Sequence, residues 1–222
     1  MDSDGQRTVV LLHGLIRSKG SMKRMERALE KEGYRVCNIG YPSTRYDIQE
    51  LASDHVYPAV IACVGDGESK IDFVTHSLGG ILVRQLADEL LSERMGRVVM
   101  LSPPNGGSEV VDRIGDWWLF KALNGPAGTE LGTESTSVPN QLGPPSFEVG
   151  IITGKRTINL INSIMIEGQD DGKVSVENAR LEGMSDFLVL PVSHPFIMKN
   201  RRAIEATHRF LDTGHFAPVA GA

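Results

Sequence analysis

Short apolar runs alternate along this chain with longer segments in which apolar residues recur at helical spacing. The apolar runs predict six strands, at Thr8–His13, Tyr34–Ile39, the stretch from Lys70 to Ser77, Arg97–Leu101, Glu148–Thr153 and Phe187–Val192. The intervening segments predict helices at Met22–Glu32, Ile48–Val64, Gly80–Arg94 and Pro195–Leu211. Continuous apolar strands alternating with helices are typical of a parallel sheet covered on both faces.

This order predicts an α/β fold with a mainly parallel sheet of about six strands and helices on both faces. At 222 residues, the expectation is a single domain over 1–222. Residues 213–222 are expected to form a loose tail. A short cap or lid is expected within 103–147, because loops of that length usually serve a site.

The cap segment contains both tryptophans of the chain, Trp117 and Trp118, followed by Phe120. One interpretation makes this segment a cap whose apolar face lines a substrate pocket, with these three residues as its wall. The other makes it a helix packed on the domain like any other. The sequence favours neither.

The composition argues against two classes of partner, nucleic acids and membranes. A net charge of -5 without a basic cluster argues against nucleic acid. No apolar run has the length of a membrane span, so we expect no stable membrane insertion. The polar start, Met1–Thr8, does not resemble a signal peptide, and a cytoplasmic protein is expected. The oligomeric state cannot be read from the sequence.

The two cysteines, Cys37 and Cys63, fall on a predicted strand and a predicted helix. Their spacing matches no short redox or zinc motif. Two buried thiols are favoured over a disulfide, because free cysteine behaves as a small apolar residue in protein cores.

The candidate chemistry centres on Ser77, between the end of a predicted strand and the start of a helix. The segment reads Thr75-His-Ser-Leu-Gly79, a Gly-x-Ser-x-Gly pattern with threonine in place of the first glycine. A sharp turn there exposes the hydroxyl beside the positive end of the helix dipole. Any strand–turn–helix unit can carry serine and glycine, so the motif alone does not decide the function.

A serine nucleophile needs a base, and the base needs an orienting acid. Of six histidines, His194 alone follows a strand and precedes a helix in a position to reach the strand ends. Asp170 and Asp171 stand in a turn beside Gly172, and either could be the acid. The chain order serine, aspartate, histidine is that of α/β-hydrolases. The backbone N–H groups of Leu15 and Leu78 are expected to form the oxyanion hole.

Several segments together resemble the α/β-hydrolase superfamily, and more narrowly the small bacterial lipases and esterases. The matching segments are Val10–Leu15, Val74–Gly80, Leu101–Ser108, Asp171–Val174 with Ala179–Gly183, and Val192–His194. The resemblance implies that Ser77 is the nucleophile, His194 the base and Asp171, rather than Asp170, the acid. It also implies ester hydrolysis through an acyl-enzyme without a cofactor.

The sequence departs from that pattern at three places. Thr75 replaces the first glycine of the Gly-x-Ser-x-Gly pattern, which affects the expected catalytic efficiency more than the identification of the family. No aspartate follows His194 as it does in the calcium-binding lipases, so no metal is expected. The acid lies well beyond the predicted fifth strand, across 154–169.

The sequence therefore predicts a serine hydrolase of short to medium acyl esters, with a small-molecule ester as its partner. A thioesterase, an amidase or an acyltransferase would use the same residues. A non-catalytic binding protein on a hydrolase fold, docking through Trp117, Trp118 and Phe120, is the alternative of a different class.

Overall fold

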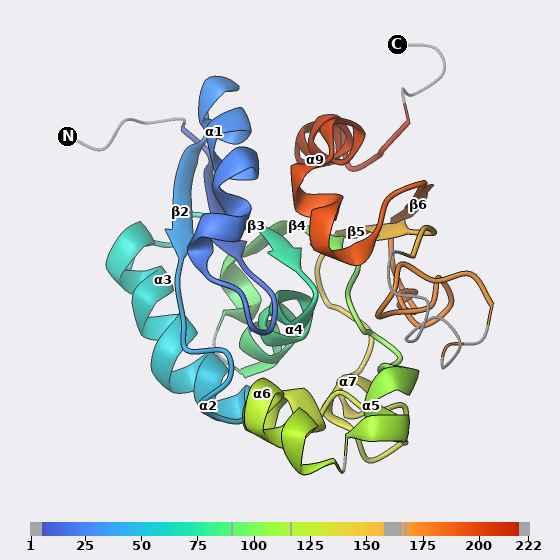
Figure 1. Ribbon diagram of the computed structural model, residues 1–222. Helices are drawn as coiled ribbons and strands as arrows, with labels where there is room; N and C mark the ends of the chain where they lie inside the picture. The colour runs from blue at the N-terminus through green and yellow to red at the C-terminus, as the bar shows by residue number, and fades with distance from the viewer. Residues whose placement is uncertain (1–5, 90, 116, 158–165, 167, 218–222) are drawn as a thin grey trace.

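The computed structural model describes residues 6–89, 91–115, 117–157, 166 and 168–217. Its six-stranded sheet has the order β2-β1-β3-β4-β5-β6, and every neighbouring pair is parallel (Figure 1). The strands are β1 (Thr8–Leu12), β2 (Arg35–Ile39), β3 (Ile71–His76), β4 (Met95–Leu101), β5 (Val149–Gly154) and β6 (Asp186–Leu190). The predicted fold class and all six predicted strands are confirmed.

Helices cover both faces of the sheet. On one face are η1 (Lys19–Met22), α1 (Lys23–Lys31), η4 (His194–Lys199) and α9 (Arg201–Thr213). On the other are α2 (Ile48–Glu50), the π-helical η2 (Leu51–Val56), α3 (Tyr57–Val64) and α4 (Leu78–Glu89). The single helix predicted over 48–64 is therefore one continuous rod whose middle turn is widened. A short helix, η3 (Ser92–Arg94), precedes β4.

The two faces have separate apolar cores because successive strand residues point to opposite sides. In β1, Val10 and Leu12 belong to the core beneath α2–α4. Val9 and Leu11 belong to the core beneath α1 and α9. All four are fully buried, which explains why the strand reads as a continuous apolar run.

The strand register brings several carboxyl ends to one edge. Leu12 of β1 pairs with Thr75 of β3, and His76 pairs with Leu101 of β4. The residues that follow these strands therefore lie side by side, as expected for a site in a parallel sheet. The helices α5 (Glu109–Ile114), α6 (Trp118–Thr129) and α7 (Val138–Gln141) gather at one end of the molecule, at the bottom of Figure 1.

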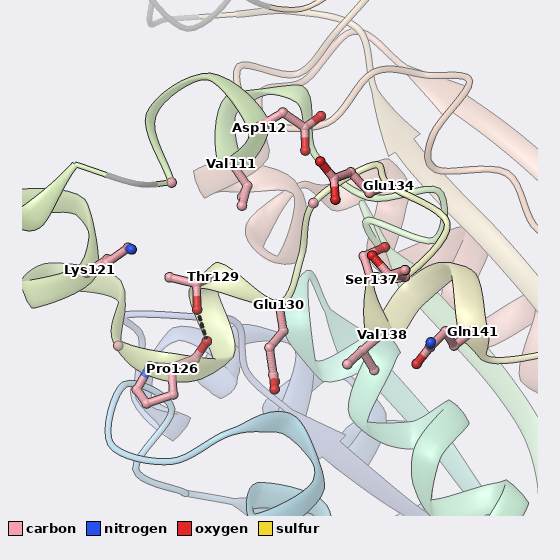
Figure 2. Close-up of a pocket in the computed structure, with 14 residues that line it drawn as sticks. Val111, Asp112, Lys121, Pro126, Thr129, Glu130, Glu134, Ser137, Val138 and Gln141 are labelled. Atoms are coloured by element: carbon pink, nitrogen blue, oxygen red, sulfur yellow. Dashed lines mark hydrogen bonds between the residues drawn. The ribbon is translucent and has the colours of Figure 1, made fainter.

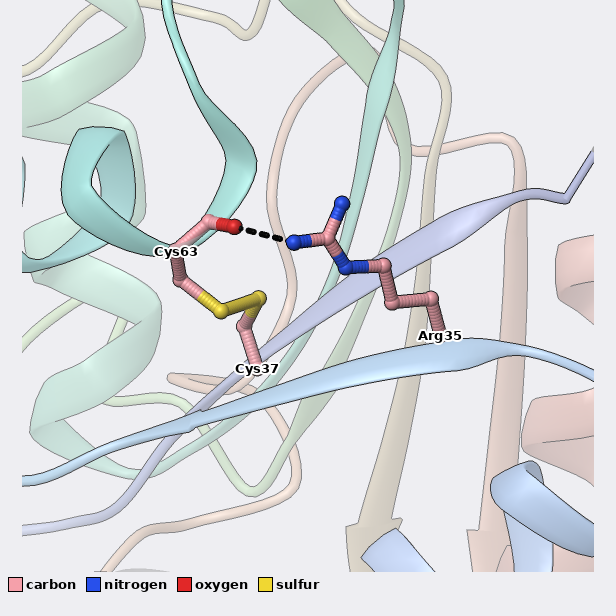
Figure 3. Close-up of a disulfide and its surroundings, with 3 residues drawn as sticks. All are labelled: Arg35, Cys37 and Cys63. Atoms are coloured by element: carbon pink, nitrogen blue, oxygen red, sulfur yellow. Dashed lines mark hydrogen bonds between the residues drawn. A yellow bond between two sulfur atoms is a disulfide. The ribbon is translucent and has the colours of Figure 1, made fainter. Parts of the chain in front are cut away.

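The prediction of two free thiols is wrong, because Cys37 and Cys63 form a disulfide (Figure 3). The bridge joins β2 to the last turn of α3, with the two Cα atoms 6.2 Å apart. Cys37 points to the core face of an edge strand, and α3 packs over that same face. Arg35 donates a hydrogen bond to the Cys63 carbonyl at 2.6 Å, which is a second link between β2 and α3.

The loose tail expected over 213–222 is also not found in its described part, which ends at 217. Gly214 ends α9 in the left-handed conformation, with φ 78°, and turns the chain back toward the sheet. Phe216 is buried against Phe210, and its N–H donates to Asp186 at 2.7 Å. These contacts fix the segment after the helix. Residues 218–222 lie outside the described part of the chain.

None of the helices in the described part of the chain has the length and apolar character needed to cross a membrane.

Candidate active site

Ser77 occupies the sharp turn between β3 and α4. Its backbone has φ 52°, in the left-handed region that non-glycine residues rarely adopt. The turn is held on both sides: the Ser77 N–H donates to the Leu101 carbonyl at 2.9 Å, and the Gly80 N–H donates to the Ser77 carbonyl at 2.8 Å. A serine fixed in this way presents its side chain at the edge where the strands end.

Two glycines allow the neighbouring backbone to approach this turn. A Cβ placed on Gly14 would lie 2.8 Å from His76 Nδ1 and 3.0 Å from Ser77 Cβ. A Cβ on Gly79 would lie 2.8 Å from the Leu12 carbonyl oxygen and 3.0 Å from that of His13. Both separations are too short for real side chains, so the loop after β1 packs directly on the serine turn.

The structure brings Asp171 and His194 together. His194 Nδ1 lies 2.8 Å from Asp171 Oδ2, and the His194 N–H donates to the Asp171 carbonyl at 2.9 Å. Both residues are buried. A carboxylate can only accept, so Nδ1 carries the proton and Nε2 is left as the proton acceptor. Asp170 instead accepts from the Gly172 N–H within its own turn.

The surroundings of Asp171 favour its charged form. Burial alone would raise its pKa, but the attraction and hydrogen bond of His194 outweigh that, and the pKa is lowered overall. The second carboxylate oxygen accepts from the N–H groups of Lys173 at 3.1 Å and Val174 at 3.0 Å. Ser102 also contributes to the lower pKa, although its buried hydroxyl makes no hydrogen bond of ordinary geometry among the described residues.

His76 has a place in the site that the sequence did not predict. Nε2 of its ring lies 3.1 Å from the His194 carbonyl oxygen, and the centroids of the two rings are 4.9 Å apart. Since a carbonyl accepts, Nε2 donates and the buried Nδ1 is unprotonated. Burial, and then the neighbouring His194, lower the pKa of His76 well below its usual value. His76 therefore stays neutral and joins the serine strand to the histidine loop.

The expected hydrogen bond between Ser77 and His194 is not formed in this structure. Within the described residues, the Ser77 hydroxyl makes no hydrogen bond, to His194 or to any other group. The His194 ring lies tilted beside the ring of His76, the residue that precedes the serine, so the imidazole lies in the same part of the site. Such bonds are often long or unformed in unliganded hydrolases and close when substrate binds.

The two expected oxyanion donors have free backbone N–H groups in this part of the structure. Leu78 is the first residue of α4, where an amide has no partner inside its own helix. The Leu15 amide donates to no carbonyl among the loop hydrogen bonds of the described residues. Leu15 follows Gly14, the residue packed against Ser77.

A cavity of about 60 Å³ lies beside the serine. Its wall combines Ser77 with apolar groups of the cap and of the loops after β1 and β4, and with Lys173. The lining is Leu15, Ser77, Pro104, Ser108, Val110, Val111, Asn124, Gly128, Leu131, Lys173 and Val174. The cavity is small and partly open to solvent, so it has room for a small group beside the serine.

Trp117 and Trp118, expected as a pocket wall, do not line this cavity. Their side chains are 67% and 78% exposed. The side chain of Phe120 lies outside the described part of the structure. Asn124 and Gly128, on either side of the break that Gly125 makes in α6 with φ 68°, line the cavity instead.

A second, larger cavity of about 790 Å³ lies on the opposite side of that half-helix (Figure 2). Asn124, Gly128 and Leu131 face the serine cavity, at helical spacing. Thr129 and Glu130 face the larger one, and Val111 lines both. Residues 124–132 therefore form a thin wall between two spaces of different polarity.

Among the described residues, no three His, Cys, Asp or Glu side chains are arranged to hold a metal ion.

Comparison with known proteins agrees with this fold. The family model described as "Alpha/beta hydrolase family" matches residues 9–157. No curated protein matches the chain. Among solved structures, the mature lipase BlEst2 of Bacillus licheniformis superposes with a TM-score of 0.73 at 21% identity, covering 96% of this chain and 93% of the lipase.

Two further structures show the same arrangement. A metagenomic carboxyl esterase has a TM-score of 0.67 at 20% identity, over 88% of this chain and 66% of its own. Phospholipase PlaB of Legionella pneumophila has a TM-score of 0.67 at 18% identity, over 86% and 53%. These similarities concern the fold, while the family model covers most of the chain. The chain belongs to the α/β-hydrolase family.

Proposed function

We propose that this protein is a serine hydrolase that cleaves carboxylic esters of short to medium acyl chain through an acyl-enzyme. The observation that carries the proposal is the buried Asp171–His194 pair, at 2.8 Å, beside the strained turn that holds Ser77. A buried imidazole with Nδ1 bonded to a carboxylate has its other nitrogen available as a base.

The proposed reaction has two stages. Ser77 Oγ attacks the acyl carbon as its proton passes to His194 Nε2, and the N–H groups of Leu15 and Leu78 stabilise the oxyanion. The bond to the alcohol oxygen then breaks, and that oxygen takes the proton from His194. Water attacks the acyl-enzyme with His194 again accepting the proton, and the free acid and serine are restored. Asp171 stays ionised and stabilises the imidazolium. No cofactor is required by this scheme.

The small serine cavity supports the proposed chain length. A space of about 60 Å³ accommodates a short acyl group, and a longer chain would extend past the cavity. We expect rates on p-nitrophenyl esters to fall beyond medium acyl length. A steady rise with acyl length and a jump at an emulsion surface would contradict this part of the proposal.

Labelling with a fluorophosphonate probe tests the central claim. The intact protein should be captured covalently, and Ser77→Ala should lose both capture and esterase activity, with a fall in kcat of roughly 10⁴-fold or more. Ser69→Ala, at an exposed position before β3 and at the opposite end of that strand from Ser77, is the matched control and should keep both. No capture of the intact protein would favour a non-catalytic binding protein.

Neighbouring activities share the same machinery. A thioesterase, an amidase or an acyltransferase would also be labelled by the probe, because the triad attacks any activated acyl carbon. Turnover of matched ester, thioester and amide substrates separates them. The proposal requires the ester to be the best of the three with water as acceptor.

The disulfide bears on where the enzyme works. A cytoplasmic location was expected from the polar start of the chain, but disulfides persist mainly in oxidising compartments. We propose an oxidising compartment as the working location. Mass spectrometry after alkylation without reductant, on protein from its native source, should find Cys37 and Cys63 unmodified. Full alkylation of both would restore the cytoplasmic prediction.

A further inference from the structure

Among the described residues that line the serine cavity, Lys173 is the charged one, and most of its neighbours there are apolar. Its position is fixed by the acid loop: its N–H donates to Asp171 Oδ1 at 3.1 Å, and its carbonyl accepts from the Ser108 hydroxyl at 2.9 Å. The backbone that positions the proposed acid therefore also positions the lysine beside Ser77.

A second cation, Arg17, lies near the first. Arg17 ends the turn after Leu15, where its N–H donates to the Gly14 carbonyl at 3.2 Å. Burial lowers the pKa of Lys173, and the positive charge of Arg17 lowers it further, against the opposing effect of Asp171. Both charges also lower the pKa of His76. Arg17 thus belongs to the loop after β1 that packs on the serine turn, and Lys173 belongs to the loop of Asp171 that lines the serine cavity.

Neither cation is neutralised. No carboxylate among the described residues lies within ion-pair distance of Lys173 or Arg17, although the protein as a whole is acidic. Lys173 has much of its side chain exposed, so its ammonium can meet an incoming molecule even though surrounding protein partly desolvates it. Partly desolvated, unpaired positive charge attracts an anion more strongly than fully solvated charge.

We propose that the preferred substrates are esters with a negatively charged group, such as a carboxylate, close to the scissile ester bond, bound by Lys173 with support from Arg17. This inference rests on the proposed esterase function and names its substrate class. Ser77 and Lys173 line the same small cavity, so we expect only a few atoms of the substrate to separate its anionic group from the reacting carbonyl. The proposal leaves Ser77, Asp171 and His194 in their roles and assigns recognition to the two cations.

Two matched pairs of esters test the proposal. Monomethyl succinate and methyl levulinate differ in a charge on the acyl side, while acetylglycolate and acetoxyacetone differ in a charge on the alcohol side. Hydrolysis is followed by pH-stat at pH 7.5. We expect kcat/KM to be about tenfold higher for the anion in at least one pair, the usual scale of a hydrogen bond to a charged group. Raising the salt concentration should reduce the preference.

Variants identify the group responsible. Lys173→Met should lower the anion-to-neutral ratio of kcat/KM by about tenfold, and Arg17→Met by a smaller factor. Lys23→Met, an exposed lysine on α1, is the matched control and should leave the ratio unchanged. Reading the ratio, rather than the rate, separates charge recognition from any general damage to the site.

The outcomes separate the two proposals. If neutral esters are cleaved but neither pair favours the anion, or if Lys173→Met leaves the ratio unchanged, the anion preference is wrong and the esterase function stands. If neither pair nor p-nitrophenyl acetate is cleaved by the intact protein, the esterase function itself fails and this inference falls with it.

Discussion

The turn around Ser77 and the first half of α6 lie in the same molecule but are built in opposite ways. The turn is largely buried, is hydrogen-bonded to Leu101 of β4, and is packed so closely at Gly14 and Gly79 that no side chain would fit. The first half of α6 exposes Trp117, Trp118, Leu119 and Leu123. The contrast indicates that backbone packing and hydrogen bonds fix the position of Ser77, whereas the first half of α6 forms part of the exposed surface.

The boundary between the two regions falls within α6. The described side chains from Trp118 to Leu123 are exposed, whereas Asn124, Ala127 and, just after the helix, Leu131 are buried. The Ala127 N–H donates to the Tyr46 carbonyl at 3.2 Å, and Glu130 accepts from the Ile48 N–H at 2.8 Å. Only the second half of the helix therefore belongs to the framework of the site.

The largest effect is expected from the disulfide, which stabilises the framework far from the cap. Replacing both Cys37 and Cys63 by serine should lower the free energy of unfolding by about 3 kcal/mol, because the bridge closes a loop with a sequence separation of 26. Urea unfolding measures the loss. The intact protein in reductant should lose a similar amount, and an unchanged transition would show that the bridge does not form.

A slightly smaller effect is expected at the serine turn. Gly79→Ala should lower kcat/KM by about 100-fold, because its Cβ would meet the Leu12 and His13 carbonyls and displace the turn. Gly67→Ala is the control, since a Cβ there meets nothing within 4 Å. Equal activity of the two variants would show that the turn tolerates movement and would remove the contrast with the cap.

The stability of the protein should depend on pH through two buried histidines near the serine turn. Burial lowers the pKa of both His13 and His76, so the unfolded chain binds more protons below about pH 6.5. Stability should therefore be fully present above that pH and decline as the pH falls. The lowered pKa of Asp171 adds a further loss only at more acidic pH, below its usual value of 3.8.

His13→Gln tests the assignment of that decline. The variant should flatten the dependence of unfolding free energy on pH between 8 and 5, because His13 Nε2 accepts from the Tyr41 N–H and cannot do so once protonated. His215→Gln, at an exposed position, is the control. An equal slope in all three proteins would assign the decline to other groups.

The smallest effects are expected in the exposed half of α6. Trp117→Ser and Trp118→Ser should change the free energy of unfolding by less than about 0.5 kcal/mol and the turnover of small esters by less than about twofold. A large loss of kcat/KM would revive the interpretation of these residues as a pocket wall. It would also mean that the cap moves when substrate binds.

The sequence predicted the parts of this structure that depend on continuous local patterns. The four inner strands β1, β3, β4 and β5 are fully or largely buried apolar runs, the edge strands β2 and β6 are partly buried, and the serine turn follows β3. The Asp171–His194 contact follows from chain order and family resemblance, and the structure brings these two side chains together. Nothing in the sequence distinguished Asp170 from Asp171 without that resemblance.

The features that were missed depend on which side of an element a residue faces. Cys37 and Cys63 are far apart in sequence, and only the packing of α3 over β2 brings them together. Phe216 follows a helix by a few residues, and the turn at Gly214 returns it to the core. The hydrogen bond from the His76 ring to the His194 carbonyl depends on how the loop that carries His194 packs beside β3.

The thin wall at residues 124–132 gives laboratory evolution a natural target. Its outward residue Thr129 can be randomised while the inward trio of Asn124, Gly128 and Leu131 is kept, or the reverse. Libraries of the first kind would reshape the outer chamber without touching the atoms around the serine. Libraries of the second kind, joined with Val111, would merge the two chambers and admit bulkier compounds.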